Sequence, residues 1–234
     1  MGCSILLFAR TPEGLSQASR ALRYEYHVEI ETFRGDLRNK EDIVSALEKA
    51  YSQFDGLDHA IIAYGNISRE PIGIDEAFWE DWIEASELYL ASTAQILNHL
   101  YRYNSKPSTT VILNSFTVPE PMDLLVIPDT VRAGLSRLVR VASRKYAPKV
   151  RPLMILLGSF RTPGALRTVS EIAKRYSLSP GEFWRNEVEA LSPLKRSGSL
   201  LEFERFMIRV LTAPEYLVGG VLVFDGGSSR VAWP

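Results

Sequence analysis

The sequence is poor in the residues that build disulfides and metal sites. Cys3 is the one cysteine among 234 residues, which excludes an internal disulfide and fits a reducing, cytoplasmic location. The three histidines, His27, His59 and His99, lie far apart in the sequence, with no cluster of cysteine or carboxylate spaced around them. We therefore expect no metal site.

The sequence also has no excess of charge of one sign and no long apolar run. Lys and Arg number 27 against 28 Asp and Glu, for a net charge of −1, so we expect no nucleic-acid partner. The longest apolar runs, such as "LMILLG" at 153–158, fall far short of the ~20 residues that span a bilayer, so no membrane partner is expected. The first apolar run, at 5–9, has the length of a strand, which argues against a signal peptide.

What the sequence does contain is a regular alternation of short apolar runs and amphipathic segments. The expected strands cover residues 3–9, 28–37, 57–65, 109–116, 150–158 and 219–227. The expected helices cover residues 15–26, 39–54, 75–103, 126–148 and 200–212. This alternation predicts an α/β fold of the Rossmann type, a doubly wound parallel sheet with helices on both faces. The continuously apolar run at 3–9 predicts a strand covered on both faces.

The chain is long enough for one sizeable core, so residues 1–234 are expected to form a single domain. One segment does not fit the alternation. Residues 160–200 are punctuated by Pro, Ser and Gly and contain helical pieces, which favours an excursion over the carboxyl edge of the sheet. Ligands bind at that edge in doubly wound folds.

The C-terminal third resembles the closing section of the short-chain dehydrogenases/reductases. The resemblance is carried by "SPLKRSG" at 192–198 and "APEYLVGGVLVFDGGSSR" at 213–230. Segments similar to others of that family occur in the expected order at 57–65, 109–115 and 150–162. The resemblance covers nearly the whole chain. It implies a Rossmann fold, descent from NAD(P)-dependent oxidoreductases, and a homodimer or homotetramer.

The same resemblance identifies candidate catalytic positions and their departures from the family. Ser115 matches the catalytic serine, whereas Pro128 and Arg132 stand where the family has its Tyr-x-x-x-Lys pair, and Tyr89 stands where it has a helix asparagine. None of the ten tyrosines is followed by lysine four positions later. Arg132 keeps a positive charge, but an arginine pKa above about 12 prevents it from shuttling a proton. It would either orient an anionic group or pair with Asp129.

The cofactor end matches the family only in part. The first turn, "FARTPEGLS" at 8–16, keeps Gly14 of the family's glycines, and Pro12 removes a backbone donor. Between Gly14 and the "GDL" at 35–37 there is room for one helix and one strand, where the family has two of each. This shortens the N-terminal, adenosine-binding half. The remaining positions that match cofactor contacts of the family are Asp36, Leu37, Gly65, Gly158 and Thr162. Gly14 and Asp36 are alternatively a helix-start glycine and a turn-forming aspartate.

These departures lead to one functional expectation and two alternatives. The first is a family member that has lost standard hydride-transfer chemistry: a pseudoenzyme, or a ligand-binding or scaffolding subunit, with binding of NAD or NADP doubtful. The second is an active NAD(P)H-dependent oxidoreductase of a small carbonyl or alcohol substrate, in which Ser115 or a water supplies the proton and Arg132 orients an anionic group. The third is a different small-molecule enzyme on the same scaffold.

The family resemblance also indicates how copies of the chain would associate. The helices at 76–103 and 131–146 correspond to those that pair across a two-fold axis in the family. The second carries an apolar stripe with helical spacing, which we expect to bury against a partner subunit: Val131, Leu135, Leu138, Val139 and Ala142.

Overall fold

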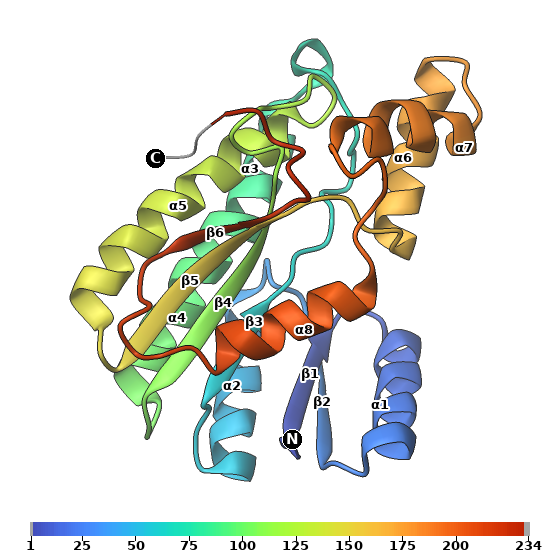
Figure 1. Ribbon diagram of the computed structural model, residues 1–234. Coiled ribbons are helices and arrows are strands. Elements are labelled where there is room, and N and C mark those ends of the chain that lie inside the picture. The colour runs from blue at the N-terminus through green and yellow to red at the C-terminus, as the bar shows by residue number, and fades with distance from the viewer. Residues whose placement is uncertain (1, 232–234) are drawn as a thin grey trace.

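The computed structural model describes residues 2–231, in which strands and helices alternate (Figure 1). The strands are β1 (Ile5–Ala9), β2 (Ile30–Arg34), β3 (His59–Ile62), β4 (Ser108–Ser115), β5 (Val150–Leu157) and β6 (Val221–Phe224). The α-helices are α1 (Pro12–Tyr26), α2 (Lys40–Phe54), α3 (Trp79–Ala85), α4 (Ser92–Tyr103), α5 (Val126–Tyr146), α6 (Pro163–Arg175), α7 (Pro180–Phe183) and α8 (Leu200–Leu211). Within residues 2–231 every helix is too short or too polar to cross a bilayer.

The core lies on both faces of the β3–β4–β5–β6 sheet, whose strands all run parallel. Consecutive residues of β4 point to opposite faces, as in any strand. Ile112 faces a cluster that includes Leu97 of α4 and Leu135 of α5. Val111 faces a second cluster, to which Met207 of α8 contributes. Helices thus cover both faces of a parallel sheet, and the predicted α/β fold is confirmed.

The apolar stripe of α5 faces the sheet. Leu135 and Val139 are fully buried within the chain, and Val131 and Ala142 join them in the same core cluster, with Leu138 packed against it. The prediction that this stripe buries against a partner subunit is therefore wrong. The helical spacing of this stripe fits any helix face that packs against an apolar surface. Here that surface is the sheet of the same chain.

The long helix expected over 75–103 is divided. The backbone of Phe78 is still extended, and its N–H donates a hydrogen bond to the Asp81 carboxylate at 2.9 Å. Helix α3 therefore begins one residue later, at Trp79. Between α3 and α4, residues 86–91 form a π-helical segment. The Ser92 hydroxyl, just beyond it, donates to the Leu88 carbonyl oxygen at 2.6 Å. Such π segments are often found at functional sites, and this one carries Tyr89.

The N-terminal half is short and set apart from the main sheet. Between Gly14 and Gly35 the chain forms only α1 and β2, as the sequence predicts. β1 pairs with β2, and in the described part of the chain no ladder joins β1 to β3. All five residues of β1 are only partly buried, so the expectation of a strand covered on both faces is wrong. Among the described residues β2 is the only strand hydrogen-bonded to β1, so β1 belongs to a two-stranded sheet rather than to the interior of the main sheet.

Residues 160–200 leave the sheet and return to the same place. The segment contains α6 and α7, and an isolated parallel bridge joins Phe160 to Gly198. A Cβ on Gly198 would lie 2.5 Å from the Phe160 ring, so this close approach requires glycine. Farther along, the buried Trp184 ring donates from Nε1 to Glu189 at 3.1 Å. These contacts position the excursion beside the carboxyl ends of β5 and β6 (Figure 1).

Candidate functional site

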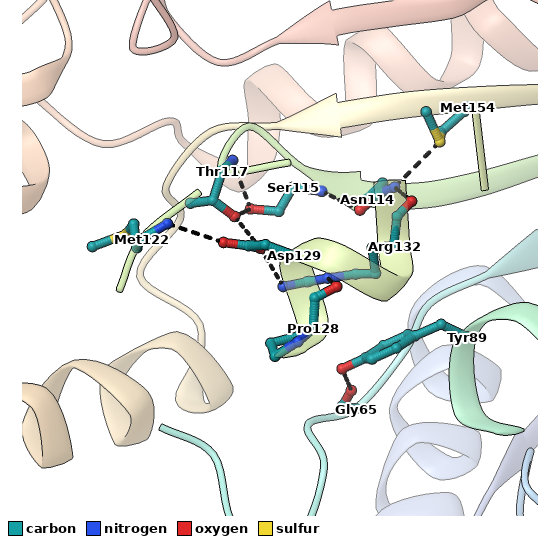
Figure 2. A network of polar contacts seen from close by, with 10 residues as sticks. All are labelled: Gly65, Tyr89, Asn114, Ser115, Thr117, Met122, Pro128, Asp129, Arg132 and Met154. Carbon is teal, nitrogen blue, oxygen red and sulfur yellow. Dashed lines mark hydrogen bonds and ion pairs between the residues drawn. The ribbon is translucent and has the colours of Figure 1, made fainter. Parts of the chain in front are cut away.

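Ser115 and the first turns of α5 meet at the carboxyl end of β4. Ser115 is the last residue of β4, and Pro128 and Arg132 lie near the start of α5 (Figure 2). Asn114 joins the two elements. Its side-chain nitrogen donates to the Arg132 carbonyl oxygen at 3.2 Å, and its Oδ1 accepts from the Ser115 backbone N–H at 2.8 Å. The fold thus brings together three positions that the sequence singled out.

Asp129 is the centre of this network. It is fully buried, and its carboxylate accepts from the Thr117 hydroxyl at 2.6 Å, the Met122 backbone N–H at 3.3 Å and the Arg132 guanidinium at 3.0 Å. The Ser115 hydroxyl lies 2.8 Å from that of Thr117. Burial raises the pKa of Asp129, and the charge of Arg132 opposes that rise. Sequence analysis treated Asp129 only as a pairing partner.

The Arg132 side chain points inward, away from solvent. Besides its ion pair with Asp129, its Nε donates to the Pro128 carbonyl oxygen at 3.1 Å, and its guanidinium carbon lies 5.3 Å from the centre of the Tyr89 ring. Only 16% of the side chain is exposed. A guanidinium stays protonated, so this residue supplies charge and hydrogen bonds to its own chain.

Tyr89 completes the inner wall of the site. It is 1% exposed, and its hydroxyl donates to the Gly65 carbonyl oxygen at 3.2 Å (Figure 2). The Tyr64 ring meets the Tyr89 ring edge-on, with 5.1 Å between their centres. Burial raises the pKa of Tyr89 well above its ordinary value, so its phenol holds its proton more tightly than an exposed tyrosine does.

Glu70 is a site residue that the sequence analysis missed. An isolated bridge between Ile72 and Leu125 holds its loop beside the start of α5. Its Oε2 atom is buried and has no hydrogen-bond partner. Burial raises the pKa of the Glu70 carboxyl to about 7, the charge of Arg132 opposes the rise, and that of Asp129 adds to it. A buried carboxyl with a pKa near neutrality is typical of functional sites. The sequence offered only its position as a clue, since Glu70 is a charged residue five positions after Gly65.

The loops after β1 and β3 converge where the family resemblance places a nucleotide. Gly14 is the third residue of α1, and a Cβ there would lie 2.8 Å from the Thr11 hydroxyl, so the position favours glycine. A Cβ on Gly65 would lie 3.3 Å from the Arg10 guanidinium. The Arg10 side chain therefore reaches from the end of β1 to the loop after β3.

Asp36 and Leu37 are occupied by contacts within the chain. The Asp36 carboxylate accepts from Arg38 at 2.6 Å, and the same arginine binds Glu84. The hydrogen bond from Arg38 holds the pKa of Asp36 below its usual range. Leu37 packs against the core cluster beneath α4 and α5. These contacts agree with the interpretation of Asp36 as a turn-forming aspartate.

Gly158 and Thr162 also have structural contacts. A Cβ on Gly158 would lie 2.6 Å from the Asp225 backbone, so glycine is needed where β5 ends against β6. Thr162 is the N-cap of α6, and its hydroxyl accepts from the Ala165 backbone N–H at 3.2 Å. Neither contact tests a role in cofactor binding, which stays a prediction.

Across residues 2–231 no three His, Cys, Asp or Glu side chains gather in a way that could hold a metal ion.

Solved structures with the same fold are numerous. L-sorbose reductase from Gluconobacter frateurii, complexed with NADPH and L-sorbose, superposes with a TM-score of 0.86 at 22% identity, over 98% of this chain and 88% of that one. An NADPH-bound short chain oxidoreductase from Pseudomonas aeruginosa PAO1, described as containing an atypical catalytic center, gives 0.75 at 21% identity over 98% and 88%.

A third structure has a length closer to that of this chain. A short chain dehydrogenase family protein from Francisella tularensis subsp. tularensis SCHU S4 gives a TM-score of 0.78 at 14% identity, over 98% of this chain and 100% of that one. No curated protein sequence matches the chain. The model of the family described as enoyl-(acyl carrier protein) reductase matches residues 1–229. The chain therefore belongs to the short-chain dehydrogenase/reductase family and has the fold of its NAD(P)-dependent oxidoreductases.

Proposed function

We propose that this chain is a ligand-binding member of its family that does not carry out tyrosine-dependent hydride transfer. The proposal rests on the two residues, Pro128 and Arg132, found where the family resemblance places the Tyr-x-x-x-Lys pair. Pro128 has no proton to give, and Arg132 is held by Asp129 at 3.0 Å and by the Pro128 carbonyl at 3.1 Å. A positioned general acid typically contributes about 10²- to 10⁴-fold, and its loss leaves binding as the main use of the site.

Weakened binding of NAD or NADP is part of the same proposal. Two of the solved relatives named above, the L-sorbose reductase and the Pseudomonas aeruginosa oxidoreductase, hold NADPH. In this chain, Asp36 is taken up by Arg38, and Pro12 at the first turn of α1 has no N–H to offer a phosphate. Gly14, Gly65, Gly158 and Thr162 remain the positions at which a nucleotide would be held.

A second candidate function is favoured by one observation. The Oε2 atom of Glu70 is buried without a hydrogen-bond partner, and burial raises the pKa of the carboxyl to about 7, so it has the properties of a general acid at neutral pH. With a nicotinamide cofactor bound, such an acid would replace the missing tyrosine in the reduction of a small carbonyl substrate.

Association as a homodimer or homotetramer through the segment 76–103 and α5 is a further part of the proposal. The outer faces of these helices carry exposed apolar side chains, among them Trp79 and Val141, which are 75% and 65% exposed. The same faces carry opposite charges, with acidic residues on the first segment and basic ones on α5: Glu80, Glu87, Arg137, Arg140 and Arg144. A cytoplasmic location, suggested by the single cysteine, also belongs to the proposal.

We expect Arg132→Met to lower the free energy of unfolding by about 3 kcal/mol at pH 8, because Asp129 would remain buried without its cation. The loss should be smaller at pH 5, where Asp129 relieves the penalty by taking up a proton. Urea unfolding at the two pH values measures this. Arg205→Met, an exposed position on α8 outside the proposed interface, should change stability by less than about 0.5 kcal/mol. Equal losses at both pH values would contradict the assigned ion pair.

The stability of Glu70→Gln relative to the native chain should increase as pH rises. A folded pKa of about 7, above the ordinary 4.5, means that the favourable protonated state is lost as pH rises through 7. The difference between variant and native chain should therefore grow by on the order of 3 kcal/mol between pH 4.5 and pH 8. Denaturant titrations at both pH values check this, with the exposed Glu171→Gln as the control. A difference that does not change with pH would show that Glu70 ionises normally.

Purified protein should leave NADH and NADPH unoxidised when offered a panel of aldehydes, ketones and 2-oxo acids. The absorbance of the reduced nicotinamide follows the reaction directly. Turnover that disappears in Glu70→Gln but survives in Ser115→Ala would overturn the proposal in favour of the second candidate. Turnover abolished by Ser115→Ala would instead restore the serine as the proton source.

Sedimentation at micromolar concentration should show a dimer or tetramer. Val141→Glu places a charge on the exposed face of α5 and should shift the protein to monomers, since a charge is costly in a buried contact. The control is Tyr216→Glu, at a side chain 99% exposed outside these helices, which should leave the assembly intact. A monomeric native chain would refute this interface.

A further inference from the structure

Residues 2–34 form a separate layer beside the main sheet. β1 and β2 pair only with each other, and α1 packs on them (Figure 1). In the described part of the chain, no residue before Gly35 belongs to, or packs against, the apolar clusters around the main sheet and in the excursion. Apolar burial is the main force that joins the parts of a protein. This unit, which we call the flap, therefore shares little of that force with the rest of the structure.

The chain passes from the flap to the main body at residues 35–39. The body side of this connection is fixed, because Leu37 packs against the main core cluster and Arg38 pairs with a carboxylate of α3. On the flap side, a Cβ on Gly35 would lie 2.6 Å from the Phe8 ring, so the position requires glycine. Glycine has the widest range of backbone angles. Gly35 is therefore placed to act as a pivot between the two parts.

One lysine of the main body holds the flap by hydrogen bonds. Lys49 of α2 donates to the Glu31 carboxylate at 2.8 Å and to the Thr32 carbonyl oxygen at 3.0 Å, both on β2. Among the described residues, no other side chain beyond Gly35 forms a hydrogen bond or an ion pair with the flap. The two charged side chains are 35% and 32% exposed, and ion pairs in contact with solvent are weak. The flap is thus held by contacts that cost little to break.

The flap carries one wall of the region between the loops after β1 and β3. Arg10 and Gly14 belong to the flap, whereas Gly65 belongs to the main body. A Cβ on Gly65 would lie 3.3 Å from the Arg10 guanidinium, so the two walls approach each other closely at this point. A ligand held between these loops would contact both parts. Displacement of the flap would therefore open this region, and its return would close the region over the ligand.

We propose that residues 2–34 swing about Gly35 as one unit and are held closed by Lys49. Units that share few apolar contacts with their neighbours open at a lower free energy than the whole protein unfolds. The closed position brings Arg10 beside Gly65, and the open position separates them. The role of this movement as a gate rests on the proposed ligand-binding function, whereas the movement itself does not.

Amide hydrogen exchange of the native chain at low, increasing urea concentrations tests the movement. Amides of β1, α1 and β2 should exchange through one common opening, at least about tenfold faster than those of β4 and β5. The rate through this opening should rise with urea, because the whole flap exposes surface together. Exchange of the flap only together with β4 and β5 would overturn the inference. Exchange of the flap amide by amide, without dependence on urea, would also overturn it.

Lys49→Met should accelerate exchange in the flap roughly fivefold and leave β4 and β5 unchanged, because it removes two polar contacts and no core contact. The control is Lys106→Met, which removes an ion pair with Asp58 within the main body and should leave the flap unchanged. Equal acceleration throughout the chain, or no acceleration in the flap, would overturn the inference. These results are independent of nicotinamide oxidation. A failure here therefore leaves the loss of hydride transfer standing, and turnover would leave the movement of the flap standing.

Discussion

The ion pair between Asp129 and Arg132 is the interaction on which the rest of the site depends. A carboxylate that is fully buried needs a cation and hydrogen bonds around it. This one obtains them from the first turns of α5 and from the loop after β4, through Thr117 and Met122. The pair therefore fixes where α5 begins relative to the sheet edge and turns the Arg132 side chain inward.

The same pair shapes the electrostatics of its surroundings. Arg132 stabilises Asp129 and lowers the cost of ionising Glu70, while Asp129 raises it. Burial outweighs both influences on Glu70, which is why its carboxyl titrates near neutrality. The Tyr89 ring centre lies 5.3 Å from the guanidinium carbon, and its hydroxyl donates to the Gly65 carbonyl oxygen in the loop after β3. A carboxyl with a pKa near 7 thus lies on the loop that carries Glu70, beside the start of α5.

Sequence patterns predicted the alternation of strands and helices because each element follows its own apolar period. The apolar stripe of α5 was assigned to a partner, although helical spacing does not distinguish a sheet of the same chain from another subunit. The π-helical segment at 86–91 was missed because its residues, SELYLA, include no Pro or Gly that would mark an irregular turn in the helix. Glu70 was missed for a different reason. Its burial depends on the bridge between Ile72 and Leu125, residues that are far apart in the sequence.

The bridge between Phe160 and Gly198 has an evolutionary consequence. Because the two ends of the excursion meet, α6, α7 and the turns after them form a closed loop whose length is uncoupled from the sheet. Loop-closure entropy changes slowly with length, by roughly 0.6 kcal/mol for each doubling. Insertions and deletions between these two residues would cost the sheet little stability. This part of the chain can therefore diversify while the layers beneath it stay constant.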